Sequence, residues 1–480
     1  MAAIVHDTCI LTMTEGQPRI LSEHSLVIDD GRVLERGPAA SFSRRVQQGT
    51  YAPVLDGRRY IVAPGLVNTH HHLYQSLTRC LPAAQDQRLF DWLLRLYERW
   101  RHLDYRAVNL AAKVSIAELL LHGCTTTSDH FYMFPPGSDV RMEAVLDAAA
   151  ELGIRIHLCR GSMSLGQSGG GLPPDDCVER DADVLADCVR VLDAYHDPRP
   201  YALRRIDLAP CSPFNVTREL LRDTQVLARE RGVLLHTHLA ETREEEVYCL
   251  ERFGCRPVQY LADLEWLGQD VYLAHCVYLN DDEIALFAQT RTGVSHNPTS
   301  NLRLGSGIAP LRRMLTAGVP VGLGVDGSSS NDGGNLLAGA KQAVLAARVL
   351  PVLEHLRANG GDRPGHTVDA CAALDPLMPV CEVFQLATIG GATCLHREEL
   401  GHLNPGAAAD FAMYRADDVA LAGAAAQDPL AALILCDGPR AERVFVAGRE
   451  VVRDGRIVAL DEFALGAEFN DLVSVRFRGS

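Results

Sequence analysis

Eight short apolar runs recur along the middle of this 480-residue chain, separated by stretches long enough to form amphipathic helices. Successive runs end at His70-His71-His72, Asp129-His130, Cys159-Arg160, Pro210-Cys211, Ala240-Glu241, His275-Cys276, His296-Asn297 and Asp326-Gly327. Strands that alternate with helices are typical of a parallel sheet. Eight such units predict an α/β fold of the closed (β/α)₈ barrel type rather than an open doubly wound sheet.

Both ends of the chain have a different pattern. Residues 26–33 alternate between apolar and polar side chains and include Asp30-Gly31, which is a signal for a tight hairpin. A similar pattern returns at residues 441–458. We therefore predict that residues 1–60 and 405–480 combine into a small accessory β-sandwich domain, and that residues 61–404 form the barrel. Two unrelated chain ends are the alternative.

Composition and charge indicate which partners the protein could bind and in which cellular compartment it could function. A net charge of -15 at pH 7 argues against a general binder of nucleic-acid phosphates. We find no basic segment followed by an apolar stretch at the N-terminus and no apolar run long enough to cross a bilayer, so we expect neither secretion nor membrane insertion. The 14 cysteines are scattered without a Cys-x-x-Cys pair, which favours a reducing, cytoplasmic compartment.

Side chains able to bind a metal ion follow several of the apolar runs. On an extended strand His70 and His72 face the same way, so their two imidazoles could bind one ion. The fifth, sixth and eighth runs add His238, His275 and Asp326. Because catalytic groups gather at the carboxyl ends of barrel strands, we expect these five residues to converge.

The types of these residues indicate which metal they would bind. Imidazoles combined with one carboxylate suit zinc or iron(II), since magnesium and calcium prefer oxygen ligands. We expect one divalent ion, zinc with iron as the alternative, bound by His70, His72, His238 and Asp326. Such an ion lowers the pKa of a bound water to about 7 and so provides a nucleophile at neutral pH. His275 should lie close enough to bond that water or the substrate.

Glu241 lies three residues beyond His238, where its carboxylate could move a proton between the water and the substrate. The alternative is a glutamate that is favoured by the dipole at a helix N-terminus. His236 could support the site without binding the metal. His130 and His157 are better interpreted as hydrogen-bonded structural residues.

Three residues could contact a flat, neutral ring, which we expect as the small-molecule substrate. Gln75 can both donate and accept hydrogen bonds, so it suits an amide-like ring edge. Arg160 could donate to a ring carbonyl, unless it forms a structural ion pair. Trp92 could close over the ring, unless it belongs to the core of a helix.

Four motifs, at residues 64–72, 236–241, 274–276 and 324–327, carry a resemblance to a known family. Together they resemble the amidohydrolase superfamily, in its branch of cytosine- and guanine-deaminase-like enzymes, and the match covers essentially the whole chain. Residues 71–79, 170–174 and 307–310 are more narrowly similar to the 8-oxoguanine deaminase group. One departure is Thr299, which stands where that group has a cysteine.

The resemblance implies a metal-dependent hydrolytic deaminase, most narrowly one that converts 8-oxoguanine and water to urate and ammonia. In that reaction Glu241 would protonate a ring nitrogen, Asp326 would take the proton of the water, and His275 would stabilise the new oxygen. Because of Thr299, the alternatives are guanine, isoxanthopterin, an aminopyrimidine or an aminotriazine. We also expect a homo-oligomer, a dimer.

Two other classes of function need consideration. A dinuclear hydrolase of cyclic amides would, by family resemblance, bridge its metals with a carboxylated lysine at the end of the fourth strand. The chain has only two lysines, Lys113 and Lys341, and both lie in helical stretches. The other class is an inactive barrel that serves as a scaffold, and the retention of every expected ligand and of Glu241 argues against it.

Overall fold

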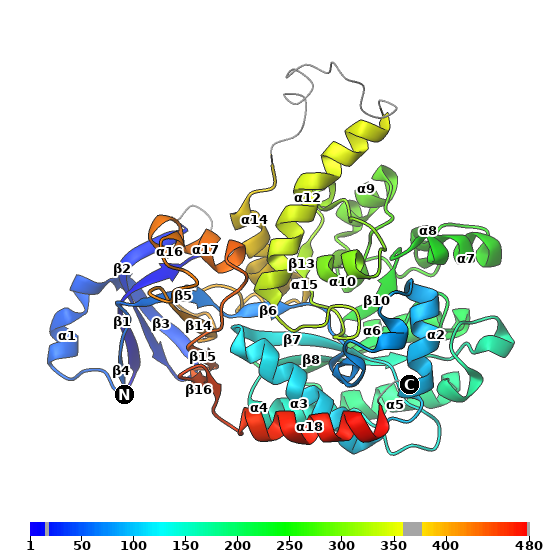
Figure 1. Ribbon diagram of the computed structural model, residues 1–480, viewed down its shortest axis with the longest axis horizontal. Helices are drawn as coiled ribbons and strands as arrows, with labels where there is room; N and C mark the ends of the chain where they lie inside the picture. Colours follow the sequence, from blue (N-terminus) through cyan, green and yellow to red (C-terminus); the bar gives the residue numbers. More distant parts are fainter. Residues whose placement is uncertain (15–18, 359–376, 478–480) are drawn as a thin grey trace.

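Eight parallel strands form a closed barrel in the computed structural model, which describes residues 1–14, 19–358 and 377–477. The strands are β6 (Leu66–Asn68), β7 (Cys124–Phe131), β8 (Arg155–Ser162), β9 (Arg204–Pro210), β10 (Leu235–Leu239), β11 (Val271–His275), β12 (Gly293–His296) and β13 (Val321–Leu323). The ring closes where Leu323 of β13 pairs with Asn68 of β6. The predicted (β/α)₈ barrel is therefore confirmed (Figure 1).

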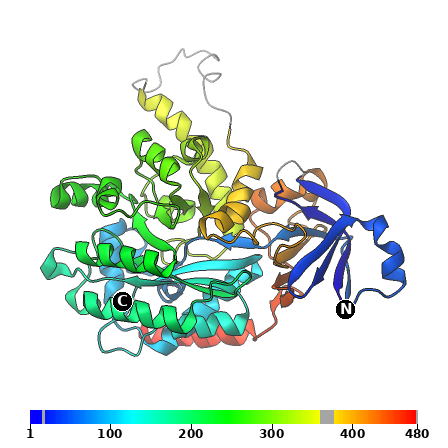
Figure 2. The same cartoon turned by 180° about the vertical axis from the view of Figure 1, so that it is seen from behind.

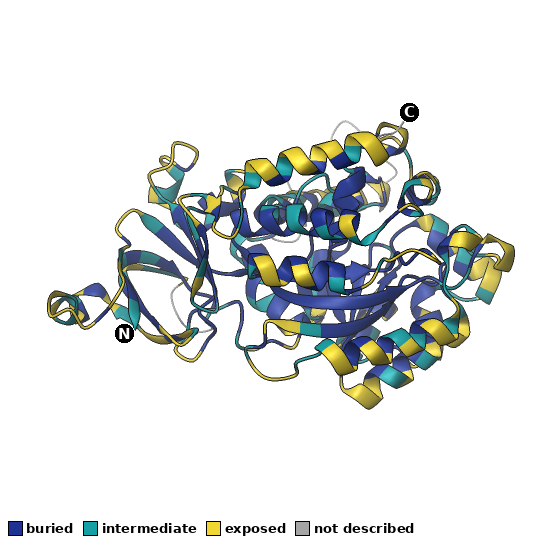
Figure 3. Cartoon of the chain, turned by 90° about the horizontal axis from the view of Figure 1, so that it is seen from below, coloured by how far each residue is buried: buried dark blue, intermediate teal, exposed yellow. Residues whose placement is uncertain are grey.

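Helices surround the barrel, and their outer faces are exposed while the strands are buried (Figure 3). They are α2 (Leu89–Trp100), α3 (Tyr105–Leu121), α4 (Glu143–Leu152), α5 (Asp181–Tyr195), α6 (Arg218–Arg231), α7 (Arg243–Phe253), α8 (Pro257–Asp263), α9 (Asp281–Thr290), α10 (Pro298–Arg303), α11 (Leu311–Ala317), α12 (Leu336–Ala358), α14 (Val380–Gln385) and α15 (Gly391–Cys394). Side-chain oxygens of Asp104, Thr217 and Thr242 cap the first turns of α3, α6 and α7. Gly153 ends α4 in the left-handed conformation at φ 78°, which glycine adopts readily.

A second sheet is built from both ends of the chain. Its strands are β1 (Ala3–Leu11), β2 (Ile20–Asp29), β3 (Arg32–Pro38), β4 (Val54–Asp56), β5 (Tyr60–Pro64), β14 (Phe411–Arg415), β15 (Arg443–Val446), β16 (Arg449–Arg453) and β17 (Arg456–Ile457). They lie in the order β17-β16-β15-β14-β5-β1-β2-β3, with β4 beside β1. Asp30 and Gly31 form the tight turn between β2 and β3, with φ angles of 44° and 72°. The predicted union of the two chain ends is confirmed, whereas the domain boundaries at residues 60 and 405 stay a prediction.

Among the described residues, four further α-helices belong to these terminal segments, namely α1 (Ser43–Gln47), α16 (Ala424–Gln427), α17 (Pro429–Leu435) and α18 (Glu462–Arg476). The last of them, α18, packs against α3 of the barrel, and its first turn contacts Arg456 of β17 in the sheet. Figure 2 shows α18 as the red helix along the barrel, with the blue and orange strands of the sheet at the other end of the molecule.

The apolar run before His70 is divided between the two sheets. Residues 60–67 form one apolar run in the sequence, but β5 pairs with β14 in the terminal sheet and only β6 enters the barrel. The division falls at Gly65, where a Cβ atom would lie 2.1 Å from Oγ1 of Thr125. A residue without a side chain is needed here because the chain passes from one sheet to the other against the wall of the barrel.

Helix α12 corrects our statement that the sequence holds no apolar run of membrane-spanning length. Among the described residues, the segment Leu336–Arg357 is long and apolar enough to cross a membrane, and 44% of its most apolar window is buried inside the protein. The helix packs against α10, α14 and α17. The apolar residues of α12 are also explained by this packing, because a helix in the outer layer of a barrel buries apolar side chains against its neighbours.

A buried ion pair joins the barrel to the terminal sheet. Arg155 of β8 donates to Asp410, which directly precedes β14, through Nε at 2.6 Å and Nη2 at 3.1 Å. Neither side chain is more than 3% exposed. Asp410 also accepts a hydrogen bond from the backbone of Ala447, and Arg155 donates to the backbone oxygen of Ala202. Each buried charge is therefore matched by polar partners.

We expect Asp410→Ala to lower the free energy of unfolding by about 3–5 kcal/mol, because it leaves the Arg155 guanidinium buried without its counter-charge. Urea denaturation followed by circular dichroism measures the loss. The matched control is Asp417→Ala, which breaks a surface pair with Arg415 and should change stability little. Equal stability of the two variants would contradict this account of the junction.

Candidate metal centre

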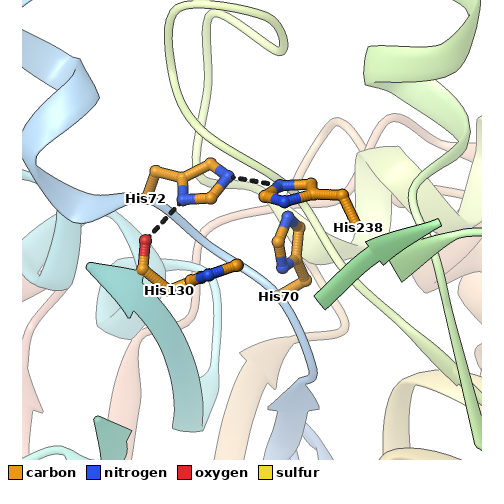
Figure 4. A group of neighbouring side chains, drawn as sticks. All are labelled: His70, His72, His130 and His238. Carbon is orange, nitrogen blue, oxygen red and sulfur yellow. Dashed lines mark hydrogen bonds between the residues drawn. The ribbon is translucent and has the colours of Figure 1, made fainter. Parts of the chain in front are cut away.

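Four predicted ligands lie together at the carboxyl end of the barrel (Figure 4 shows the three histidines). His238 belongs to β10, whereas His70 and His72 follow the last residue of β6 and Asp326 follows β13. The ring centres of His70 and His72 are 4.7 Å apart, and those of His70 and His238 are 4.9 Å apart. His70 and His72 thus approach each other from the loop just beyond β6. His71, which lies between them in the sequence, is buried but does not belong to this group.

Hydrogen bonds fix which ring nitrogen carries the proton in His72 and His238. Nδ1 of His72 lies 2.6 Å from the backbone oxygen of His130, and Nδ1 of His238 lies 2.6 Å from that of Cys211. Because a carbonyl oxygen can only accept, each Nδ1 must carry the hydrogen. Each Nε2 is then left with a lone pair, and the two Nε2 atoms face each other at 3.1 Å.

His70 is oriented by two successive hydrogen bonds. Nδ1 of His236 lies 2.6 Å from the backbone oxygen of Tyr272 and must donate to it. Nε2 of His236 therefore accepts from Nδ1 of His70 at 2.8 Å. This leaves a third lone pair on Nε2 of His70, which is buried and has no hydrogen-bond partner in the described part of the chain. His236 thus sets the tautomer of His70, which is the usual way in which a neighbouring group supports a metal ligand.

The carboxylate of Asp326 lies beside these lone pairs, with Oδ1 3.3 Å from Nε2 of His70 and 3.3 Å from Nε2 of His72. Three lone pairs and a carboxylate repel one another in a buried site unless a cation lies between them. Three imidazoles with one carboxylate are ligands that suit zinc or iron(II). The residues present therefore fit one divalent ion.

The protonation of these groups favours metal binding. Burial lowers the pKa of His70, His72 and His238 below the ordinary range, so their rings are neutral. Burial raises the pKa of Asp326, but attraction to His70 and the other histidines, which acts whenever one of these rings is protonated, holds that pKa well below the usual range. A neutral imidazole and an ionised carboxylate are the forms that coordinate a metal.

Glu241 and His275 face the same centre. Oε2 of Glu241 lies 3.7 Å from Nε2 of His275, and that nitrogen lies 3.8 Å from Oδ2 of Asp326. Nδ1 of His275 donates to the side-chain oxygen of Asn301 at 2.8 Å, so its Nε2 also presents a lone pair. Burial, with a further contribution from the charge of Asp326, raises the pKa of Glu241 well above the usual range. That shift favours a protonated Glu241 that can donate.

The backbone at the strand ends is held in costly conformations. Ala240, His275 and Asp326 have φ angles of 50°, 74° and 64°, in the left-handed region that disfavours residues other than glycine. Glu245 supports the first of these turns, because its carboxylate accepts from the backbone nitrogens of Ala240 and Glu241 at 2.9 and 2.8 Å. Such strain is maintained by the surrounding barrel and is typical of functional sites.

A cavity with apolar and polar lining lies against these groups. Its apolar side chains are Leu89, Trp92, Leu93, Phe214 and Leu304, and its polar side chains include Gln75, Tyr132, Ser212, Asn215 and Ser330. Gln75 donates to the hydroxyl of Tyr132 at 3.4 Å, and its Oε1 is buried without a partner. Nε1 of Trp92 is likewise buried without an acceptor. Both predicted ring contacts therefore line the cavity, and each has a buried polar atom without a partner among the described residues.

Arg160 is the predicted site residue that lies elsewhere. It lines a separate surface pocket with Phe134, and its guanidinium pairs with Glu179 at 2.7 Å and Asp187 at 2.6 Å. The side chain is 1% exposed. Arg160 therefore forms the structural ion pair that we considered as the alternative to a ring contact.

Sequence reasoning did not anticipate two features of the site. His130, which we interpreted as a hydrogen-bonded structural residue, does donate from Nε2 to the backbone oxygen of Ala209 at 2.8 Å, but it also lies in one cluster with His70, His72 and His238, and its ring stacks on His238 at 4.8 Å. Its position in β7 near the strand end was a signal that we discounted. Ser212 and Asn215 line the cavity from the segment after β9. Strand alternation gives no signal there, because it does not extend into an irregular segment.

Known proteins provide relatives over nearly the whole chain. The model of the amidohydrolase family matches residues 61–451. An 8-oxoguanine deaminase from Pseudomonas aeruginosa is 42% identical over 454 residues, which cover 95% of each chain. An isoxanthopterin deaminase from an unknown prokaryotic organism is 38% identical over 88% of this chain and 86% of its own. A solved structure of an atrazine chlorohydrolase from Arthrobacter aurescens TC1, complexed with zinc, is 32% identical with a TM-score of 0.87 and covers 98% of this chain and 100% of that chain.

We expect His238→Ala to lose bound metal and activity together while the barrel stays folded, because the variant removes one of three converging lone pairs. Metal content is measured by inductively coupled plasma mass spectrometry, and folding by circular dichroism. His102→Ala, which changes an exposed histidine between α2 and α3, is the matched control and should keep its metal. Retention of metal by His238→Ala would show that the ligand set is wrong.

Proposed function

Because this chain belongs to the amidohydrolase family, we propose that it is a metal-dependent deaminase that converts 8-oxoguanine and water to urate and ammonia. The relatives support the broader statement that it is a hydrolase of C–N bonds acting on a heterocycle. One observation carries the proposal. Three buried Nε2 lone pairs meet the carboxylate of Asp326, and the protonated form of Glu241 is favoured beside them.

In this proposal His70, His72, His238 and Asp326 hold one divalent ion. We propose zinc, because the related atrazine chlorohydrolase is complexed with zinc, and iron(II) is the alternative. When bound, such an ion lowers the pKa of a water molecule to about 7.

The residues of the chain would move the protons of the reaction. Oxygen from water adds to the ring carbon that bears the amine, and Glu241 donates a proton to the neighbouring ring nitrogen. Asp326 takes one proton of the water, within reach of Nε2 of His275 at 3.8 Å. Because that nitrogen starts with a lone pair, His275 must gain a proton before it can donate to the new oxygen. The proton taken from the water then passes to the amine, which leaves as ammonia, and the proton of the remaining hydroxyl returns to Glu241 as the carbonyl of the product forms.

Gln75 and Trp92 would hold the ring. Oε1 of Gln75 can accept from a ring N–H, and Nε1 of Trp92 can donate to a ring carbonyl or nitrogen. Apolar side chains around them provide the surface on which a flat heterocycle packs. We no longer include Arg160 among the ring contacts, because its guanidinium is occupied by Glu179 and Asp187.

The position of Thr299 supports the narrow substrate despite its departure from the group pattern. Thr299 lies in α10 and is not among the described residues that line the cavity. Its Oγ1 instead lies toward Gly339 of α12. Isoxanthopterin is the second candidate, because a deaminase of that compound is 38% identical. Guanine, an aminopyrimidine and an aminotriazine complete the alternatives.

The two lysines provide no support for a dinuclear amidase. Lys113 of α3 pairs with Glu151 at 2.7 Å, and Lys341 of α12 pairs with Asp437 at 2.5 Å. Neither lines the cavity described above. Location in the cytoplasm and assembly into a homodimer stay predictions.

We expect Glu241→Gln to keep its metal and to lose on the order of 10² to 10⁴ in kcat, because the amide cannot donate the proton that the ring nitrogen needs. Steady-state kinetics measure the loss, and metal analysis checks the site. Glu244→Gln, three residues into the same segment and outside the cavity lining, is the matched control and should turn over normally. Near-normal turnover by Glu241→Gln would remove Glu241 from the proposed mechanism.

We expect the enzyme to release ammonia from 8-oxoguanine with kcat/KM above that for guanine, isoxanthopterin, an aminopyrimidine and an aminotriazine. Ammonia release is measured over this panel, and urate is followed by its ultraviolet absorbance. Glu241→Gln serves as the inactive control for background hydrolysis. Good turnover of a pterin or a triazine without turnover of 8-oxoguanine would show that the proposed substrate is wrong, although the protein would still be a deaminase.

A further inference from the structure

Two polar side chains that the mechanism does not use line the cavity from the segment that follows β9. Ser212 and Asn215 are each 1% exposed. Oγ of Ser212 and Oδ1 of Asn215 are buried, and neither has a hydrogen-bond partner among the residues that the structure describes. Buried polar atoms are almost always paired, so an unpaired atom at the edge of a binding cavity calls for an explanation.

The amide of Asn215 is held so that its oxygen is free. Its nitrogen donates to Sγ of Cys211 at 3.2 Å and to the hydroxyl of Tyr97 at 3.4 Å. Its backbone oxygen accepts from the nitrogens of Ser164 and Leu165, both at 3.0 Å. These contacts fix the residue at both ends, and they leave Oδ1 as an acceptor without a donor.

The charges around the cavity define what such an acceptor can bind. The carboxyl groups of Glu241 and Asp326 belong to the lining, and the described lining residues include no arginine or lysine. An anionic ring would meet no counter-charge from these side chains, whereas a neutral ring could be recognised by hydrogen bonds alone. Oδ1 of Asn215 needs an N–H group, and the hydroxyl of Ser212 can donate to a carbonyl.

We infer that Asn215 and Ser212 form a specificity pair for the oxidised edge of the purine, in which Oδ1 of Asn215 accepts from a ring N–H and the Ser212 hydroxyl donates to the adjacent ring carbonyl. This inference rests on the proposed function. The five-membered ring of 8-oxoguanine carries N–H groups on both sides of its carbonyl. In guanine the same carbon bears only hydrogen, and one of the two nitrogens has no hydrogen. A neutral acceptor beside a hydroxyl therefore distinguishes the two bases.

The test compares two bases in two variants. We expect Asn215→Leu, which keeps a similar volume but cannot accept, to lower kcat/KM for 8-oxoguanine by about 10- to 100-fold. The same variant should change kcat/KM for guanine by less than about 3-fold, because the inference places against Oδ1 of Asn215 the ring nitrogen that carries no hydrogen in guanine. If guanine is turned over too slowly, its inhibition constant against 8-oxoguanine replaces kcat/KM.

Tyr97→Phe is the matched control, since it removes one partner of the Asn215 amide and leaves Oδ1 in place. It should affect both bases alike, and metal content and circular dichroism should match the unchanged enzyme in both variants. Equal losses for the two bases in Asn215→Leu, or no loss for 8-oxoguanine, would overturn the inference while the deaminase stands. Failure of the unchanged enzyme to turn over 8-oxoguanine would instead overturn the narrow substrate, and the specificity pair with it.

Discussion

The structure depends on three buried imidazoles whose lone pairs point at one another. Backbone oxygens next to the barrel fix the tautomers of His72 and His238, and His236 fixes that of His70. Each acceptor therefore turns an Nε2 atom inward, and Asp326 adds a negative charge at the same place. An arrangement of this kind is unfavourable in the protein alone, because like partial charges are buried together without water. A bound cation attracts each of these groups, and these attractions outweigh the repulsion among them.

The barrel supplies the stability that such a centre requires. Strands of a closed parallel sheet hold their ends at fixed positions, so the left-handed turns at Ala240, His275 and Asp326 can be maintained against their conformational cost. Two glycines also let side chains of the site lie close to the backbone inside the barrel. A Cβ atom on Gly324 would lie 2.9 Å from Cβ of His70, and one on Gly327 would lie 1.9 Å from Oε1 of Gln75. Glycine at both positions lets these side chains pack against the backbone that carries Asp326.

The sequence predicted the eight strands and the cluster of His70, His72, His238, His275 and Asp326, because strand ends in a barrel meet at one face whatever the helices between them do. It failed where the outcome depended on tertiary contacts. Gly65 divides an apolar run that looks continuous, since either sheet would bury the same side chains. Arg160 lies near the end of strand β8, yet two carboxylates from other segments bind it. The cavity-lining positions of Ser212 and Asn215 depend on the path of a loop, which no periodicity encodes.

The two carboxyl groups of the centre illustrate how one cavity can hold both an acid and a base. Asp326 lies against the histidines, and their interactions hold its pKa well below the usual range although burial acts in the opposite direction. Glu241 is buried with the negative charge of Asp326 nearby, and its pKa is raised well above the usual range. Two carboxyl groups whose environments separate their pKa values in this way can take opposite roles in proton transfer. The 3.7 and 3.8 Å distances from His275 to each of them place an imidazole between the donor and the acceptor, so protons could be exchanged among the three groups without leaving the cavity.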